Sequence, residues 1–107
     1  MASLGTITLK GESGKTYEFN IYDRSATFTA VGAIYVMSRV SSPNTYSIIY
    51  IGETGDLSSR PLDHHKTACF DKHKADKLLI RSAPNAKQRL ADETDLIRHY
   101  QPPCNDQ

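Results

Sequence analysis

The sequence predicts an α+β fold, a small central β-sheet flanked by helices with an extra β-hairpin at the N-terminus. Apolar and polar residues alternate in several short runs, which is typical of strands. Two longer segments in the second half carry helix start and stop signals. The chain has 107 residues, 38% of them hydrophobic and 23% charged, which is the size and composition of one globular domain.

The first third of the chain predicts a hairpin. Residues 6–10 and 16–22 alternate in polarity, and the glycine-containing segment 11–15 between them is a good turn. We expect this hairpin to be an added edge of the sheet. In that description residues 1–30 are an N-terminal extension and residues 31–105 are the core of a single domain spanning 1–107.

Residues 32–40 and 46–51 are rich in Ile, Val and Tyr and predict a central hairpin around the turn cluster 41–45. The midpoint between Tyr35 and Tyr50 falls inside that cluster. In this register the two tyrosines lie directly opposite each other on one face, with Cβ atoms about 4.5–5.5 Å apart. A bulge would slip the pairing by one residue and send the rings to opposite faces.

A helix is expected next, ending near Lys72. Asp56 or a following serine can cap it, and Ser58 or Ser59 is favoured because Pro61 then falls near the first helical positions. Residues 76–83 predict a further strand.

The last helix is predicted over residues 86–100, opened by Pro84-Asn85 and stopped by Pro102-Pro103. Five of its residues follow the spacing of one buried stripe: Ala86, Leu90, Glu93, Ile97 and Tyr100. Glu93 stands in the middle, where leucine would be expected. A carboxylate on an inward face is costly unless it is paired, hydrogen-bonded or bound to a metal. The alternatives are a partner such as Arg60 or Arg81, or a half-exposed position.

Charge is unevenly distributed. Residues 60–89 carry eight Lys/Arg against three Asp/Glu, a net of +5, whereas residues 1–59 have a net of −1 and residues 90–107 a net of −3. A basic segment suits binding of a phosphate backbone. The alternative is a solvated, lysine-rich helix face.

The bulk properties predict a cytoplasmic protein. No apolar run approaches the roughly 20 residues of a membrane helix, and the N-terminus lacks the basic and apolar regions of a signal peptide. Cys69 and Cys104 do not make a disulfide framework, so we expect reduced thiols.

Four features recur in an ordered set: Tyr35 in Ala33-Ile34-Tyr35, Tyr50 in Tyr50-Ile51-Gly52, Arg60 ten residues after Tyr50, and Glu93 twelve residues before Asn105. This succession, over residues 31–105, resembles the GIY-YIG nuclease family. The family includes intron homing endonucleases, some restriction enzymes and the nuclease of nucleotide excision repair.

The resemblance implies roles for several residues. Glu93 becomes the ligand of one divalent cation, Mg²⁺ or Mn²⁺, since Mg²⁺ needs few protein carboxylates. Arg60 would hold the scissile phosphate and offset charge in the transition state. His64, four residues later, could accept a proton or keep a tyrosine hydrogen-bonded.

By the same resemblance, Tyr50 is the first candidate to activate the attacking water, with Tyr35 positioning that water or helping as a base. A phenol is a poor base in water, but a nearby cation and arginine favour the phenolate. Gly52 allows a close backbone approach. Asn105 is expected to hydrogen-bond backbone near the site and fix the tail.

The chain departs from the family pattern at three positions. Ala33 replaces the usual glycine before Ile-Tyr, and Pro61 follows the key arginine. Glu53 stands where some members have a lysine, which removes a phosphate contact and could add a metal or proton ligand.

The leading hypothesis is a metal-dependent endonuclease that hydrolyses duplex or branched DNA, in repair or restriction, without membrane association. A homodimer or a helper protein would serve targeting. A second interpretation is a nucleic-acid-binding module that has kept the fold and lost efficient turnover. A third is a small zinc protein, because His65, Cys69 and His73 recur every four residues and Cys104 could supply a fourth ligand.

Overall fold

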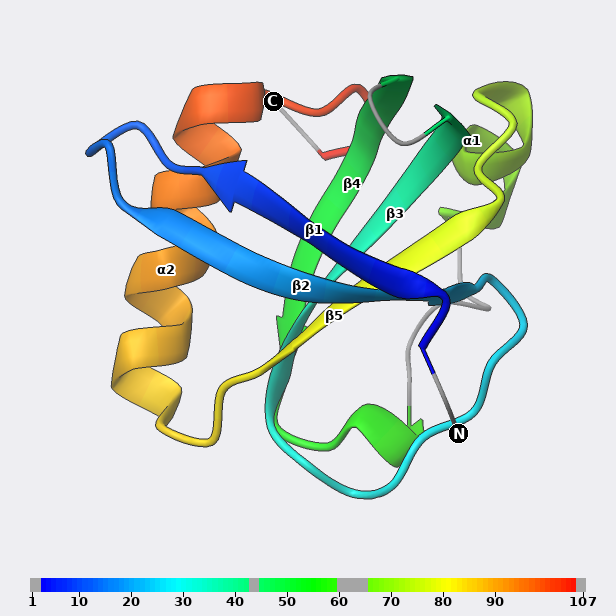
Figure 1. Cartoon of the computed structure of the whole chain (residues 1–107). Helices are drawn as coiled ribbons and strands as arrows, with labels where there is room; N and C mark the ends of the chain where they lie inside the picture. The colour runs from blue at the N-terminus through cyan, green and yellow to red at the C-terminus, as the bar shows by residue number, and fades with distance from the viewer. Residues whose placement is uncertain (1–2, 43–44, 60–65, 106–107) are drawn as a thin grey trace.

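The computed structural model describes residues 3–42, 45–59 and 66–105. Its centre is a five-stranded antiparallel sheet in the order β1-β2-β5-β3-β4 (Figure 1). The strands are β1 (Gly5–Lys10), β2 (Thr16–Asp23), β3 (Ala33–Ser42), β4 (Thr45–Thr54) and β5 (Lys77–Ser82). The predicted α+β class and the N-terminal hairpin at a sheet edge are confirmed.

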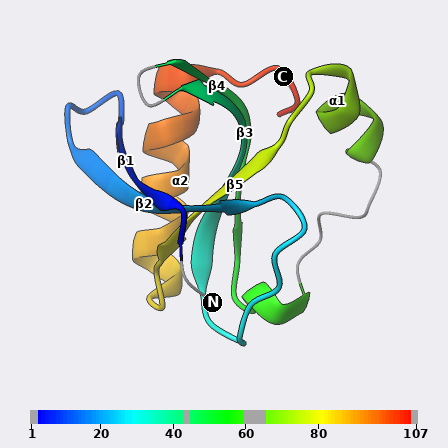
Figure 2. The ribbon, with the colours of Figure 1, turned by 45° about the vertical axis from the view of Figure 1, so that its right-hand side comes forward.

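The two helices, α1 (Thr67–Lys72) and α2 (Ala86–Tyr100), lie on opposite faces of the sheet (Figures 1 and 2). Each face has its own apolar cluster. Phe70 of α1 packs with residues such as Tyr35 and Met37, and Leu96 of α2 packs with residues such as Ile34 and Ile51. Alternation along β3 therefore sends Tyr35 to the α1 face and its neighbours to the α2 face.

The predicted bounds of the last helix are confirmed. The side chain of Asn85 accepts a hydrogen bond from the Gln88 backbone N–H at 2.9 Å, so it caps the first turn. Gln101 adopts the left-handed conformation with φ 45°, and Pro102 follows, which ends the helix.

The start of the preceding helix differs from the prediction. Residues Leu57–Ser59 form a short 3₁₀ turn, capped by Asp56 rather than by either serine, with Ser58 N–H donating to Asp56 Oδ1 at 3.0 Å. The Asp56 carboxylate accepts hydrogen bonds from the residues two and three positions later, Ser58 and Ser59, which is a common local capping pattern of aspartate. The expected helix end at Lys72 is correct, whereas Pro61 lies outside the described residues.

The central hairpin has a different register from the one predicted. Tyr35 pairs with Gly52, and Tyr50 pairs with Met37. The pairing shifts once between Met37 and Ser38 and again between Val40 and Ser42. Relative to the expected register the net offset is two residues, an even number, so the two tyrosines remain on the same face.

The inward face of α2 is also not the predicted stripe. Leu90 is 50% exposed, while Arg89, Asp92 and Leu96 are buried. The polar members of this face are satisfied by partners. Asp92, for example, is 3.4 Å from both Lys15 Nζ and the Tyr17 hydroxyl. Glu93, Ile97 and Tyr100 of the predicted stripe are partly buried, whereas Arg89 and Asp92 were missed because charged side chains are ordinarily exposed.

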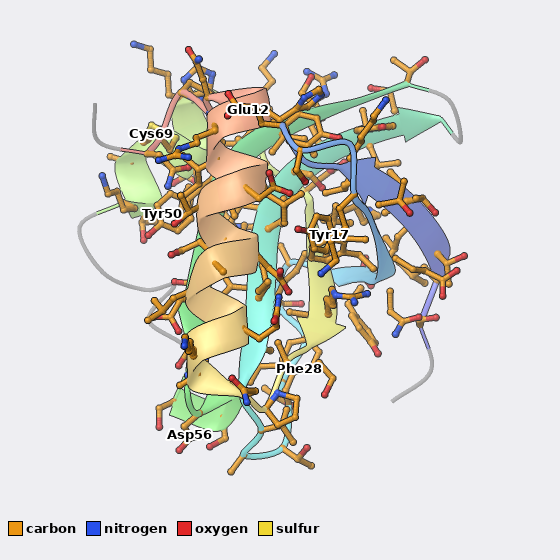
Figure 3. The ribbon with its side chains drawn as sticks, turned by 90° about the vertical axis from the view of Figure 1, so that its left-hand side faces the viewer. Glu12, Tyr17, Phe28, Tyr50, Asp56 and Cys69 are labelled. Carbon is orange, nitrogen blue, oxygen red and sulfur yellow. A yellow bond between two sulfur atoms is a disulfide. The ribbon has the colours of Figure 1, made fainter. Side chains whose placement is uncertain are left out.

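The N-terminal hairpin is tied to α2 by polar contacts centred on Asp95. Its carboxylate accepts hydrogen bonds from the Tyr17 hydroxyl at 2.8 Å and from the Ser13 backbone N–H at 2.9 Å. Figure 3 views the sheet past α2, with Tyr17 on one side of the helix and Tyr50 and Cys69 on the other. One side of α2 therefore faces the N-terminal hairpin, and the other faces the region of Tyr50 and Cys69.

Cys69 and Cys104 form a disulfide, so the prediction of two reduced thiols is wrong. The fold brings α1 and the segment after α2 together, with the two Cα atoms 5.8 Å apart, a separation that suits a disulfide. A sequence separation of 35 residues gave no sign of this contact. Within the described ranges, no helix is long and apolar enough to cross a membrane.

Candidate active site

The site is built around Tyr35, whose ring lies across the neighbouring strand at Gly52. Tyr35 is only 2% exposed. A Cβ placed on Gly52 would lie 2.5 Å from Tyr35 Cζ and 2.6 Å from its hydroxyl oxygen, closer than real side chains allow. The absence of a side chain at Gly52 thus lets the Tyr35 phenol extend across β4 toward the edge of the sheet.

Tyr50 lies beside Tyr35 on the same face, with ring centroids 6.1 Å apart. The other side of the Tyr50 ring contacts Phe70 of α1 at a centroid distance of 5.5 Å. The Lys66 ammonium lies 6.0 Å from the centre of the Tyr50 ring. One phenol is therefore buried, and the other is half-buried with a cation next to it.

Glu93 reaches the same region from α2. Its carboxylate is half-buried, and no hydrogen bond or ion pair joins it to another residue of the described segments. Burial raises the pKa of Glu93 to about 7, and the nearby charge of Glu53 adds to this increase. A carboxylate in this position lacks the counter-charge that would favour its ionised form.

Tyr35 lies within electrostatic reach of Tyr50 and of both carboxylates, Glu53 and Glu93. Burial raises the pKa of Tyr35 above its ordinary range, and Tyr50, Glu93 and Glu53 each contribute further. Two phenols and two carboxylates thus gather at one place. In the absence of a cation, Tyr35 keeps its proton and acts as a hydrogen-bond donor.

Arg89 completes the surroundings of Glu53. Arg89 Nε lies 2.7 Å from Glu53 Oε1, and Arg89 Nη1 donates to the Ala83 backbone oxygen at 2.8 Å. The arginine side chain is 8% exposed and the glutamate side chain 26%. A Cβ on Gly32 would meet Arg89 Nη1 at 2.5 Å, so this glycine makes room for the guanidinium.

The tail that follows α2, residues 102–105, holds β4 on both sides of Tyr50. The Asn105 carboxamide accepts from Ile51 N–H at 3.0 Å and donates to the Ile51 backbone oxygen at 2.9 Å. The Cys104 N–H donates to the Ile49 backbone oxygen at 3.0 Å. The strand segment that carries Tyr50 is thereby fixed.

The structure brings three of the predicted catalytic residues together, Tyr35, Tyr50 and Glu93, with Gly52 and Asn105 adjoining them. The other two, Arg60 and His64, lie outside the described residues.

Sequence reasoning missed Arg89 and Lys66. Arg89 is four residues before Glu93, a helical spacing that could have indicated its proximity. No comparable signal marked Lys66, whose ammonium lies next to the Tyr50 ring.

Three of the four ligands proposed for zinc lie close together, but the two cysteines among them are bonded to each other. Ligand atoms of Cys69, His73 and Cys104 lie within 4.8 Å of one another. Both sulfurs are bonded to each other, however, and a disulfide provides no thiolate for a metal. His65 falls outside the described residues.

The residues around Glu93 fit a hard divalent cation better. Such ions take oxygen ligands, and Mg²⁺ commonly uses one or two carboxylates together with water and substrate phosphates. Glu93 offers such a carboxylate, since it is half-buried and has no partner in the described segments.

Comparison with known proteins identifies the fold. No protein-family model and no curated protein matches the chain. Two solved structures are similar to it, both point mutants of the GIY-YIG N-terminal endonuclease domain of UvrC from Thermotoga maritima, bound to its catalytic divalent cation. The TM-score is 0.59 in both cases, at 23% and 21% sequence identity, over 74% of this chain and 87% of each UvrC chain. The protein therefore has a GIY-YIG-like fold.

Proposed function

We propose that this protein is a divalent-metal-dependent endonuclease that hydrolyses phosphodiester bonds in DNA. The observation that carries the proposal is that Glu93, an unpaired carboxylate of α2 in the described structure, lies within electrostatic reach of the buried Tyr35 phenol, whose ring lies next to that of Tyr50. The similarity to a nuclease domain bound to its catalytic divalent cation supports a nucleic-acid substrate and use of a metal.

Glu93 would hold the cation, Mg²⁺ or Mn²⁺. When bound, the ion would supply stabilisation of negative charge on the phosphate oxygens. Arg60 is assigned to the scissile phosphate through the motif that it shares with the family.

The two tyrosines have different roles toward the attacking water: Tyr50 accepts its proton and Tyr35 orients it. A water oxygen would attack phosphorus while the bond from phosphorus to the leaving oxygen breaks. Tyr50, having first released its own proton to solvent, would accept the proton of the attacking water, and the leaving oxygen would take a proton from solvent. Tyr35 keeps its proton, because burial and its neighbours raise its pKa, so its role is to orient the water by donating a hydrogen bond. His64 is assigned to proton acceptance or to holding a tyrosine in place.

Lys66 is a candidate for the phosphate contact that Glu53 cannot make. Its ammonium lies next to the Tyr50 ring, so a phosphate bound near that phenol would be within reach of a flexible lysine. In those members of the family that have a lysine at this site, the lysine directly follows Tyr-x-Gly, whereas Lys66 lies 13 residues after Glu53.

The experiment is cleavage of supercoiled plasmid and of branched DNA with Mg²⁺ or Mn²⁺. We expect metal-dependent cleavage that is lost in Glu93→Ala and Arg60→Ala. Cleavage that persists in both variants contradicts the assignments.

The second candidate is a binding module with this fold, which a net charge of only +1 and the buried, protonated Tyr35 favour. DNA binding with a salt dependence, without metal-stimulated cleavage, selects that function.

A further inference from the structure

The ion pair between the buried Arg89 and the half-buried Glu53 has its arginine one helical turn from Glu93. Arg89 and Glu93 are four residues apart on α2, a spacing at which opposite charges on a helix contact each other. An arginine and a glutamate so placed are natural partners. In this protein, however, no described residue forms an ion pair with Glu93.

Two hydrogen bonds hold the Arg89 guanidinium to groups other than Glu93. Nε is bound to Glu53 at 2.7 Å and Nη1 to the Ala83 backbone oxygen at 2.8 Å. These two bonds direct the guanidinium toward the ends of β4 and β5. The surrounding backbone at Gly32 leaves space for it there.

We propose that Glu53 is a positioning residue that binds Arg89 and thereby keeps the Glu93 carboxylate free for a divalent cation. This inference rests on the proposed function, in which Glu93 is the metal ligand. Glu53 also neutralises the charge of Arg89, which would otherwise repel a cation bound nearby. The glutamate at a position where some members of the family have a lysine thus orients Arg89 in this chain.

Two other roles for Glu53 predict different behaviour. As a direct metal ligand, Glu53 would be needed whether or not Arg89 is present. As a purely structural ion pair, it would affect stability and leave metal affinity unchanged. A double-variant comparison separates the three roles because only the proposed one makes Arg89 harmful once Glu53 is gone.

The test is titration with Mn²⁺, followed by electron paramagnetic resonance, of the unaltered protein, Glu53→Gln, and Glu53→Gln combined with Arg89→Gln. Glutamine at position 89 retains a donor for the Ala83 oxygen, and Arg89→Met is the second choice if that protein does not fold. We expect Glu53→Gln to weaken Mn²⁺ binding by about 10-fold or more, a typical effect of removing a residue that supports a metal ligand. The double variant should recover affinity to within about 3-fold of the unaltered protein.

Asp92→Asn is the matched control, since it also removes an ion-paired carboxylate, one that lies on α2 directly before Glu93. Its Mn²⁺ affinity should be unchanged. Equal weakening in the Glu53 single and double variants overturns the inference in favour of a direct ligand. Unchanged affinity in Glu53→Gln overturns it in favour of a structural pair, and so does an unaltered protein that binds no Mn²⁺.

Cleavage assays on the same proteins distinguish this inference from the proposed function. If the affinity pattern holds and no protein cleaves DNA, the role of Glu53 stands and the nuclease proposal fails. If the unaltered protein cleaves DNA but Glu53→Gln binds Mn²⁺ normally, the nuclease proposal stands and the positioning role fails.

Discussion

At the scale of single residues, the site combines groups that are costly in isolation. Glu93 is a half-buried carboxylate without a partner in the described segments, and Tyr35 is a phenol buried against Gly52. Such groups reduce the stability of the folded protein, and proteins retain them mainly where function requires them.

Glu93→Gln should stabilise the protein at high pH. The pKa of Glu93 rises from 4.5 to about 7 on folding, so ionisation costs folding free energy that appears between these values and persists above pH 7. Discounting for solvent screening, we expect a gain of about 1–2 kcal/mol at pH 8 that shrinks toward zero at pH 5. Chemical denaturation at the two pH values measures it. A variant less stable than the unaltered protein at pH 8 contradicts the account of this carboxylate.

Gly52→Ala should disable the site while Gly55→Ala does not. A Cβ at Gly52 displaces the Tyr35 phenol, and a misplacement of about 1 Å can cost about 100-fold in rate. At Gly55 a Cβ would meet Arg89 Nη2 at 3.6 Å, an ordinary contact. Single-turnover cleavage rates of the two variants compare them directly, and equal rates would exclude this role for Gly52.

At the scale of elements, the strands and α2 were predictable because local signals agree with the final structure. Pro84, Asn85 and Pro102 mark the two ends of α2 within the sequence itself. The register of β3 with β4 was not predictable, because the pairing beside the turn, Ser42 with Thr45, is already offset by two residues from the expected one. Two irregularities, between Val40 and Ser42 and between Met37 and Ser38, cancel each other, and neither carries a glycine or proline. Sequence patterns also missed Arg89, because an arginine on a helix is ordinarily solvent-exposed.

Asn105→Ala tests whether the tail fixes β4 for catalysis. The change leaves the N–H and C=O of Ile51 without their carboxamide partner, which should cost about 1–3 kcal/mol of stability and lower cleavage as Tyr50 loses its support. Asn85→Ala is the control. It removes the cap of α2 at a cost of about 1 kcal/mol and should leave cleavage near normal. Equal cleavage by the two variants, assayed well below their unfolding temperatures, argues against a role of the tail beyond stability.

At the scale of the whole molecule, the disulfide joins two segments that the sequence does not relate. Cys69 belongs to α1 and Cys104 to the tail, so the bond links one face of the sheet to the end of the chain. Composition alone led to the opposite expectation, since two cysteines among 107 residues are typical of reduced proteins.

Reduction of this disulfide should lower the stability of the entire fold. Closing a loop of 35 residues restricts the unfolded chain and is worth about 4 kcal/mol in the chain-entropy treatment. Thermal unfolding with and without a dithiol reductant measures the loss. The Cys69→Ser/Cys104→Ser protein should resemble the reduced form and show no response to the reductant. A reductant effect of equal size in that variant contradicts the assignment.

Because β4 is the last strand in the sheet order, its outer side would otherwise present unpaired amide and carbonyl groups to other molecules. Residues 104 and 105 occupy these groups at Ile49 and Ile51 without forming a strand of their own. A chain shortened before Cys104 would leave these amide and carbonyl groups unpaired, and two such chains would be free to pair edge to edge along β4, next to Tyr50.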